Sequence, residues 1–301
     1  MDKHHTNILV TDSGLGGLSV FAGLARGLAQ NHDYDSISLT YFNAWPKQHK
    51  GYNHFPDMEA RARVFNNAMT AMGKFKPDTI LIACNTLSVI YPLTQFSKNT
   101  DIPVTGIVDH GVGMMAEQLT RDPDSRVVIF ATPTTIEGNT HKKALVDQGF
   151  APDRIITQGC LNLAGKIERD PFGREVTQMI QANTKDAAEK AGPCRGKLFA
   201  ALCCTHFGYC RDQFQAALAS QASTDVVILN PNDQMVEQTC PNQEKNQAGG
   251  PKIKIQIFSR VSWEDSRIQA YDRLITPVSS KVVTALKHYT LNKSLFSIDI
   301  D

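Results

Sequence analysis

Short runs of β-branched and apolar residues alternate along this chain with stretches that have helical periodicity. Residues 57–74, for example, place apolar side chains three or four positions apart, and residues 172–191 form a second helical stretch. Parallel strands need long crossover connections, so this alternation predicts an α/β fold with mainly parallel, doubly wound sheets. The expected strands lie at 7–11, 37–42, 79–83, 103–108, 126–131, 154–158, 197–203 and 225–230.

The length of the chain predicts two domains. It has 301 residues, and a domain takes roughly 150. Residues 80–86 and 199–206 resemble each other, because each is an apolar strand of small residues that ends in cysteine, with threonine within two positions. The sequence therefore indicates two related halves.

Composition excludes several classes of protein. Hydrophobic residues make up 42% and charged residues 20%, as in ordinary globular proteins. Lysine and arginine total 31 against 30 acidic residues, so we expect no nucleic-acid partner. No apolar stretch approaches the ~18 residues of a membrane span, and residues 1–5 do not resemble a signal peptide. We expect a cytoplasmic, soluble protein with no membrane partner.

Polar turns follow several of the predicted strands, at 11–14, 84–86, 132–135 and 203–206. In open α/β sheets ligands bind at the carboxyl ends of the strands. The glycine-rich loop 12–19 does not spell a dinucleotide or Walker motif. It permits a tight turn in which Asp12 or Ser13 caps a helix. A carboxylate beside a hydroxyl can also hold an ammonium group.

The cysteines are odd in number and irregular in spacing, which predicts thiols. They are Cys84, Cys160, Cys194, Cys203, Cys204, Cys210 and Cys240.

Cys84 and Cys204 each follow a buried strand, where helix-terminal amides favour a thiolate. The other cysteines are expected to pack as small apolar residues. Cys203, Cys204, His206 and Cys210 crowd within eight positions, but no CxxC pair occurs, so we expect no metal. His206 is better interpreted as an acid or an orienting donor beside Cys204.

Three motifs together, at 12–17, 83–86 and 204–206, resemble those of the cofactor-independent glutamate racemases in the aspartate/glutamate racemase superfamily. The resemblance extends to 103–109, 132–136, 160–168 and 257–274. It implies two α/β domains with the substrate in the cleft between them and one cysteine on either face of the α-carbon. It also implies that no cofactor is needed. We expect pseudo-symmetric domains at 1–109 with 213–301, carrying Cys84, and at 110–212, carrying Cys204.

The resemblance also assigns roles to individual residues. Cys84 and Cys204 would be the two bases, assisted by Asp12, His206 and Glu168. The expected substrate-binding residues are Ser13, Asn85, Thr86, Thr135, Thr205 and Tyr52.

The chain departs from the family pattern where the substrate's side chain is received. The family has a Pro-Tyr-Gly turn there. In this chain the matching region, residues 45–53, reads Trp-Pro-Lys-Gln-His-Lys-Gly-Tyr-Asn. Lys47, His49 or Lys50 could supply charge to a carboxylate, or could belong to a solvated basic loop. Asp109-His110 replaces Glu-Pro, and residues 207–209 replace Tyr-Pro.

Racemisation supports the two-thiol interpretation, because it removes a proton from one face of a carbon and returns one to the other. With contacts near 3.5 Å, the sulfurs would lie roughly 7 Å apart across the substrate. The residues and the resemblance together therefore predict an amino-acid racemase of the glutamate racemase type that is independent of pyridoxal phosphate. A racemase or isomerase for aspartate or another acidic substrate, and a non-catalytic amino-acid binder, are the alternatives. The sequence is also compatible with a homodimer.

Residues 241–251 are expected to form an exposed insertion, and residues 291–301 show no strong pattern.

Overall fold

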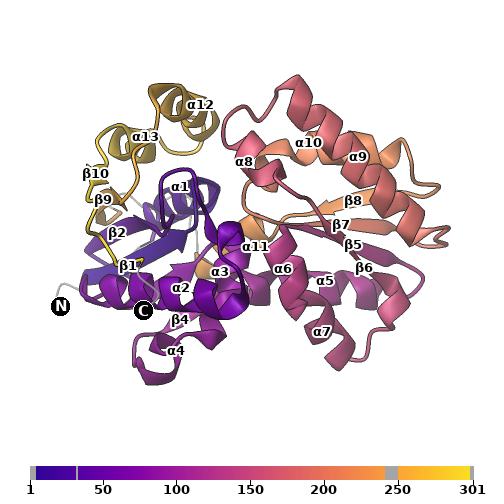
Figure 1. Ribbon diagram of the computed structural model, residues 1–301, viewed down its shortest axis with the longest axis horizontal. Helices are drawn as coiled ribbons and strands as arrows, with labels where there is room; N and C mark the ends of the chain where they lie inside the picture. The colour runs from indigo at the N-terminus through magenta and orange to yellow at the C-terminus, as the bar shows by residue number, and fades with distance from the viewer. Residues whose placement is uncertain (1–4, 32, 241–249, 299–301) are drawn as a thin grey trace. The chain divides into compact units, whose positions relative to one another are not determined.

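The computed structural model describes residues 5–31, 33–240 and 250–298. Contacts divide the chain into two units, Met1–Gly106 with Met235–Asp301 and Ile107–Gln234 (Figure 1). The second unit thus extends to Gln234, beyond the boundary at 212 that we expected. The reason is that the strand at 226–229 pairs within the second sheet.

The first unit contains a six-stranded sheet in which every pair is parallel, in the order β10-β9-β2-β1-β3-β4. Its strands are β1 (His5–Asp12), β2 (Ser36–Asn43), β3 (Thr79–Ile82), β4 (Val104–Gly106), β9 (Lys252–Ser259) and β10 (Thr290–Leu291).

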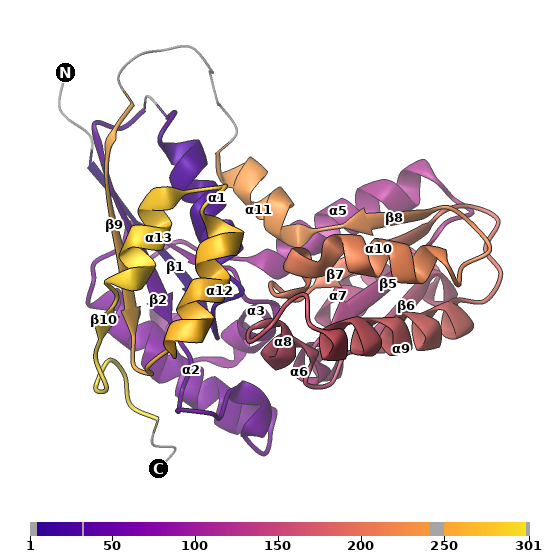
Figure 2. The same cartoon turned by 90° about the horizontal axis from the view of Figure 1, so that it is seen from above.

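Helices cover both faces of this sheet, α1, α12 and α13 on one and α2 on the other (Figures 1 and 2). Successive side chains of a strand point to opposite faces of the sheet. Tyr41 of β2 accordingly contacts Phe21 of α1, while its neighbour Phe42 points to the face that α2 covers. The helices are α1 (Leu18–Leu28), α2 (Met58–Gly73), α3 (Asn85–Ile90), α4 (Phe96–Asn99), α12 (Asp265–Ile275) and α13 (Ser280–Lys287), with short 3₁₀ turns at Tyr52–His54 and Tyr91–Leu93.

The second unit contains a four-stranded parallel sheet in the order β6-β5-β7-β8. Helices α9 and α10 lie on one face and α5 and α7 on the other (Figure 1). The strands are β5 (Arg126–Ala131), β6 (Ile155–Gly159), β7 (Leu198–Cys203) and β8 (Val226–Leu229). The helices are α5 (Ile107–Arg121), α6 (Pro133–Gly138), α7 (Thr140–Asp147), α8 (Leu163–Ile167), α9 (Arg174–Ala191) and α10 (Arg211–Ala219), with 3₁₀ turns at Pro152–Arg154 and Phe207–Cys210. Helix α11 (Pro231–Thr239) contains the second boundary between the units.

The two sheets repeat one topology. Strand order β2-β1-β3-β4 in the first unit matches β6-β5-β7-β8 in the second, with each number raised by four. The predicted α/β class with related halves is therefore confirmed. In both units a cysteine follows the third strand of the repeat, Cys84 after β3 and Cys204 after β7.

All eight predicted strands exist, with shifts at their ends. At 103–108 only Val104–Gly106 are extended, and α5 begins at Ile107. Strand β9 was not predicted, although its alternation of polar and apolar residues at 252–255 is typical of a strand with one buried face. Most of the predicted insertion, residues 241–249, lies outside the described residues.

The C-terminal segment completes the first unit. Its strand β10 pairs with β9, and Phe296 is 5% exposed with its ring 5.8 Å from that of Phe42. The aromatic contact explains why a segment without a clear sequence pattern packs. Within the described residues no helix is both long and apolar enough to cross a bilayer.

Aromatic packing holds the core of the second unit. Phe214 of α10 is fully buried, and its ring lies 5.2 Å from that of Phe130 and 5.4 Å from that of Phe207. These three rings join β5, α10 and the segment that follows Cys204. Their packing therefore stabilises both the sheet and the turn that carries His206.

We predict that Phe214→Ala lowers the free energy of unfolding by about 3–5 kcal/mol, because it leaves a cavity among these rings. Phe172→Ala is the matched control, since Phe172 belongs to the same unit but is 64% exposed. It should change that free energy by less than about 0.5 kcal/mol. Urea denaturation of the full chain, followed by circular dichroism, measures both values. Equal effects would contradict the described packing.

Candidate active site

Cys84 lies at the carboxyl edge of the first sheet, beside the loop that follows β1. Thr11 pairs with Ile82, and the backbone N–H of Ala83 donates to the carbonyl of Thr11 at 2.9 Å. This register brings Ser13 and Cys84 together, with Ser13 Oγ 3.2 Å from Cys84 Sγ. Cys84 is 6% exposed.

Asp12 is fully buried at the end of β1, in register with Asn43 of β2. It does not cap α1, which begins at Leu18 with Gly17 as its N-cap residue and no side-chain cap. A Cβ at Gly17 would lie 2.6 Å from Asp12 Cβ, so the glycine is needed for the loop to fold over the carboxylate. Neither Asp12 nor Ser13 is therefore the N-cap residue of α1.

The surroundings of Cys84 favour its protonated form. Burial is the main cause that raises the pKa of the thiol, to about 12, and the charge of Asp12 also raises it. The hydrogen bonds from Ser13 and from the backbone of Leu87 and Ser13 oppose this shift but do not reverse it. At neutral pH Cys84 carries its proton.

Cys204 belongs to a chain of three buried groups at the matching edge of the second sheet. Cys204 Sγ lies 3.9 Å from His206 Nδ1, and His206 Nε2 lies 2.8 Å from Glu168 Oε2. Each of the three residues is 6% exposed. Glu168 follows α8 and reaches the site from the segment after β6.

His206 is protonated in this chain of groups. Burial is the largest effect and lowers the pKa, but the hydrogen bonds and charges of Cys204 and Glu168 together raise it to about 10. Both ring nitrogens then donate, one to the sulfur and one to the carboxylate. The imidazolium thus lies between the Cys204 sulfur and the Glu168 carboxylate.

The remaining predicted site residues lie at the same two sheet edges. Asn85 and Thr86 are buried in the first turn of α3, and Tyr52 is 3% exposed. Thr132 caps α6 by accepting from the backbone N–H of Thr135, whose hydroxyl lies 3.0 Å from that of Thr132. Ala131, the last residue of β5, pairs with Cys203 of β7. This pairing places the turn after β5 beside Cys203.

Thr205 is 2% exposed, and its carbonyl accepts from Asn232 Nδ2 at 3.0 Å. We did not predict from the sequence that Asn232 contacts a site residue. Its position just after the predicted strand 225–230, where ligand-binding turns occur, could have indicated it.

The basic loop does not join the site residues. Lys47, His49 and Lys50 are exposed, in a turn where His49 has a positive φ of 64°. All seven cysteines are free thiols. Across residues 5–31, 33–240 and 250–298 no group of three His, Cys, Asp or Glu side chains is placed to hold a metal ion.

A family model described as Asp/Glu/Hydantoin racemase matches residues 8–239. The chain belongs to this family. The predicted family and the predicted enzyme class, an isomerase of the racemase type, are thereby confirmed.

Curated relatives of this racemase include two glutamate racemases. That of Vibrio vulnificus strain YJ016 is 24% identical over 271 residues, which cover 88% of this chain and 92% of the relative. That of Helicobacter pylori strain 26695 is 24% identical over 278 residues, covering 88% and 98%. The matches thus span nearly the whole of these relatives.

Solved structures share the fold of this racemase. The glutamate racemase of Campylobacter jejuni superposes with a TM-score of 0.67 at 21% identity, over 91% of this chain and 100% of the other. That of Francisella tularensis, in complex with D-glutamate, gives a TM-score of 0.65 at 18% identity, over 98% of each chain.

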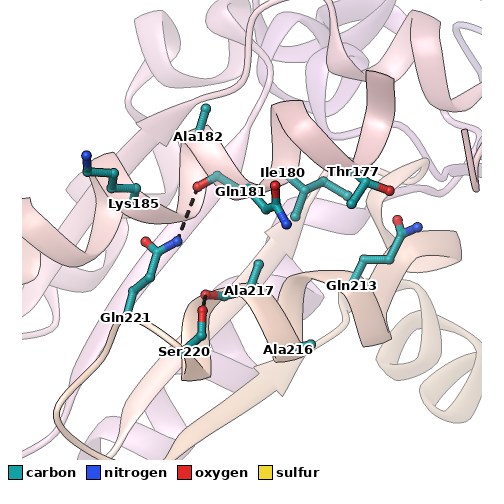
Figure 3. A pocket seen from close by; sticks show the side chains of 10 residues that line it. All are labelled: Thr177, Ile180, Gln181, Ala182, Lys185, Gln213, Ala216, Ala217, Ser220 and Gln221. Atoms are coloured by element: carbon teal, nitrogen blue, oxygen red, sulfur yellow. Dashed lines mark hydrogen bonds between the residues drawn. The ribbon is translucent and has the colours of Figure 1, made fainter. Parts of the chain in front are cut away.

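A surface groove of about 570 Å³ lies between α9 and α10 of the racemase (Figure 3). Gln221 donates to the carbonyl of Gln181 across it at 3.4 Å. The groove carries amides, hydroxyls and one lysine, and none of the predicted site residues. Its lining residues are Thr177, Ile180, Gln181, Ala182, Lys185, Gln213, Ala216, Ala217, Ser220 and Gln221.

We predict that Glu168→Gln destabilises the racemase in a pH-dependent way. The folded-state pKa of His206 lies above its usual 6.5, so protonated His206 stabilises the fold fully below pH 6.5. This stabilisation is lost as the pH rises toward 10. The variant should therefore be less stable by about 3–5 kcal/mol below pH 6.5, and the deficit should shrink toward pH 10.

Urea denaturation at several pH values measures this deficit, and an NMR titration of His206 should show a lower pKa in the variant. Glu175→Gln is the control, because Glu175 is 62% exposed and pairs with Lys166 at 2.6 Å. That change should cost less than about 1 kcal/mol at every pH. A deficit independent of pH would refute the protonated pair.

Proposed function

We propose that this protein is a cofactor-independent racemase for an acidic amino acid, of the glutamate racemase type, with Cys84 and Cys204 as its two bases. The observation that carries the proposal is the equivalent placement of the two thiols, each after the third strand of a repeated sheet, in surroundings of opposite electrostatic character. The nearly full-length similarity to glutamate racemases supports glutamate as the substrate.

Racemisation by two bases needs one deprotonated and one protonated group at the start of each turnover. Burial and Asp12 hold the proton on Cys84. On the other side, Cys204 Sγ lies 3.9 Å from His206 Nδ1. We assign the role of first base to Cys204, whose sulfur faces the His206 ring, and the role of acid to Cys84. One turnover exchanges their protonation states, and the opposite enantiomer is then the substrate.

Substrate binding offsets the free-energy cost of the state in which Cys84 has lost its proton. The α-ammonium group of an amino acid beside Asp12 and Ser13 places a positive charge near Cys84, which favours the Cys84 thiolate. Asn85 and Thr86 from the first unit, and Thr135 and Thr205 from the second, are polar groups suited to the α-carboxylate. Hydrogen bonds to that carboxylate stabilise the charge that develops when the α-proton leaves.

We predict that Cys84→Ala and Cys204→Ala each lower racemisation by at least about 10³-fold, because the proton can then be neither removed from nor returned to one face. Serine at either position should leave at most slow exchange of the α-proton. Cys194→Ala is the control, since Cys194 is partly exposed and hydrogen-bonded to the carbonyl of Asp124.

The measurement is incubation of L-glutamate, L-aspartate and a panel of neutral amino acids in heavy water, followed by chiral analysis and mass measurement. Racemisation of aspartate alone would support the aspartate alternative. Binding of amino acids without deuterium at the α-position would support a non-catalytic binder. Undiminished activity of either alanine variant would remove the two-thiol mechanism.

A further inference from the structure

Arg260 follows β9 at the same sheet edge as the Cys84 site. Ser259, the last residue of β9, pairs with Asn43 of β2, and Asn43 pairs with Asp12 of β1. Asn43 Nδ2 also donates to Ser259 Oγ at 3.0 Å. The strand ends that carry Arg260 and Asp12 are thus aligned across the sheet.

The C-terminal segment fixes where the guanidinium lies. Arg260 Nη1 donates to the carbonyl of Phe296 at 2.6 Å, and the guanidinium carbon lies 4.9 Å from the centre of the Phe296 ring. Phe296 belongs to the hydrophobic cluster on the α2 face, which also contains Tyr52 and Cys84. The positive charge is therefore held on the face of the sheet that carries Cys84.

A reciprocal pair of hydrogen bonds joins the loop after β2 to the segment after Arg260. Gln48 Nε2 donates to the carbonyl of Ser262, and the backbone N–H of Ser262 donates to Gln48 Oε1, both at 3.1 Å. The ring of Trp45 covers Gly51, where an added Cβ would lie 2.8 Å from a ring carbon. These contacts fix the loop immediately before Tyr52 against the end of β9.

Tyr52 belongs to the same hydrophobic cluster as Phe296 and Cys84, and it carries a buried hydroxyl. The residue is 3% exposed, and its Oη has no hydrogen-bond partner among the described residues. Burial raises the pKa of Tyr52, the nearby Cys84 raises it further, and the Arg260 charge lowers it. A buried hydroxyl without a partner is destabilising, and a hydrogen bond to a ligand oxygen would offset that cost.

We propose that Arg260 and the Tyr52 hydroxyl form the subsite that receives the side-chain carboxylate of the substrate. This inference rests on the proposed racemase function and specifies its substrate as a dicarboxylic amino acid. Arginine suits this role because its planar guanidinium matches a carboxylate and its charge persists when partly buried. A neutral side-chain amide would gain no charge-assisted hydrogen bond there.

The test compares Arg260→Gln, Arg260→Lys and Tyr52→Phe with the wild type. Calorimetry measures binding of D-glutamate and D-glutamine, and heavy-water exchange gives kcat and KM for both. We expect Arg260→Gln to weaken glutamate binding by roughly 10²-fold and to raise KM more than it lowers kcat, with little change for glutamine. Lysine should restore part of the loss, and Tyr52→Phe should cost roughly 10-fold.

Arg63→Gln on α2 is the control, since the Arg63 side chain is 52% exposed, and it should change neither substrate. Equal losses for glutamate and glutamine in Arg260→Gln would mean that Arg260 only anchors Phe296, and would overturn the inference. Unchanged glutamate binding, or no glutamate binding by the wild type, would also overturn it. If binding depends on Arg260 but no α-proton exchanges, the subsite stands and the racemase function fails.

Discussion

Parallel pairing of the central strands is the constraint on which the candidate site depends. In each unit the strand order brings the turns after neighbouring strands to one edge, so residues far apart in the chain meet there. Ser13 and Cys84 are 71 positions apart yet lie within 3.2 Å. Glu168 and His206 are 38 positions apart and 2.8 Å from each other. The register of β1 with β3 brings about the first of these contacts, and the segment after β6 that contains α8 brings Glu168 to His206.

Burial gives these polar groups their chemical character. In water the two thiols would behave alike. Inside the protein one is placed beside a buried carboxylate and the other beside an imidazolium that a second carboxylate holds protonated. The two thiols differ because different charged groups surround each sulfur in place of water. Burial strengthens the effect of every nearby charge on such a group. A repeated topology can therefore place two equivalent cysteines beside neighbours of opposite charge.

Much of this organisation could be predicted from the sequence. The alternation of strand and helix patterns predicted the α/β class, and the similar ends of residues 80–86 and 199–206 indicated the repeat. Strand β9 and the role of Phe296 escaped prediction, because a short alternating run and a single aromatic residue give weak local signals. The domain boundary at 212 also differed from the structure, since pairing of β8 with β7 depends on contacts distant in sequence.

The sequence by itself determined most of the elements, including the first eight strands, and the chemical groups at their ends. The motifs at 12–17, 83–86 and 204–206 name the thiols, the carboxylate and the histidine, because turn geometry and residue type are local properties. Only the tertiary structure decided that His206 bonds to Glu168, that Asp12 is buried beside Cys84, and that Arg260 lies against Phe296. Those facts depend on strand register and on exclusion of water, which arise when distant segments pack together.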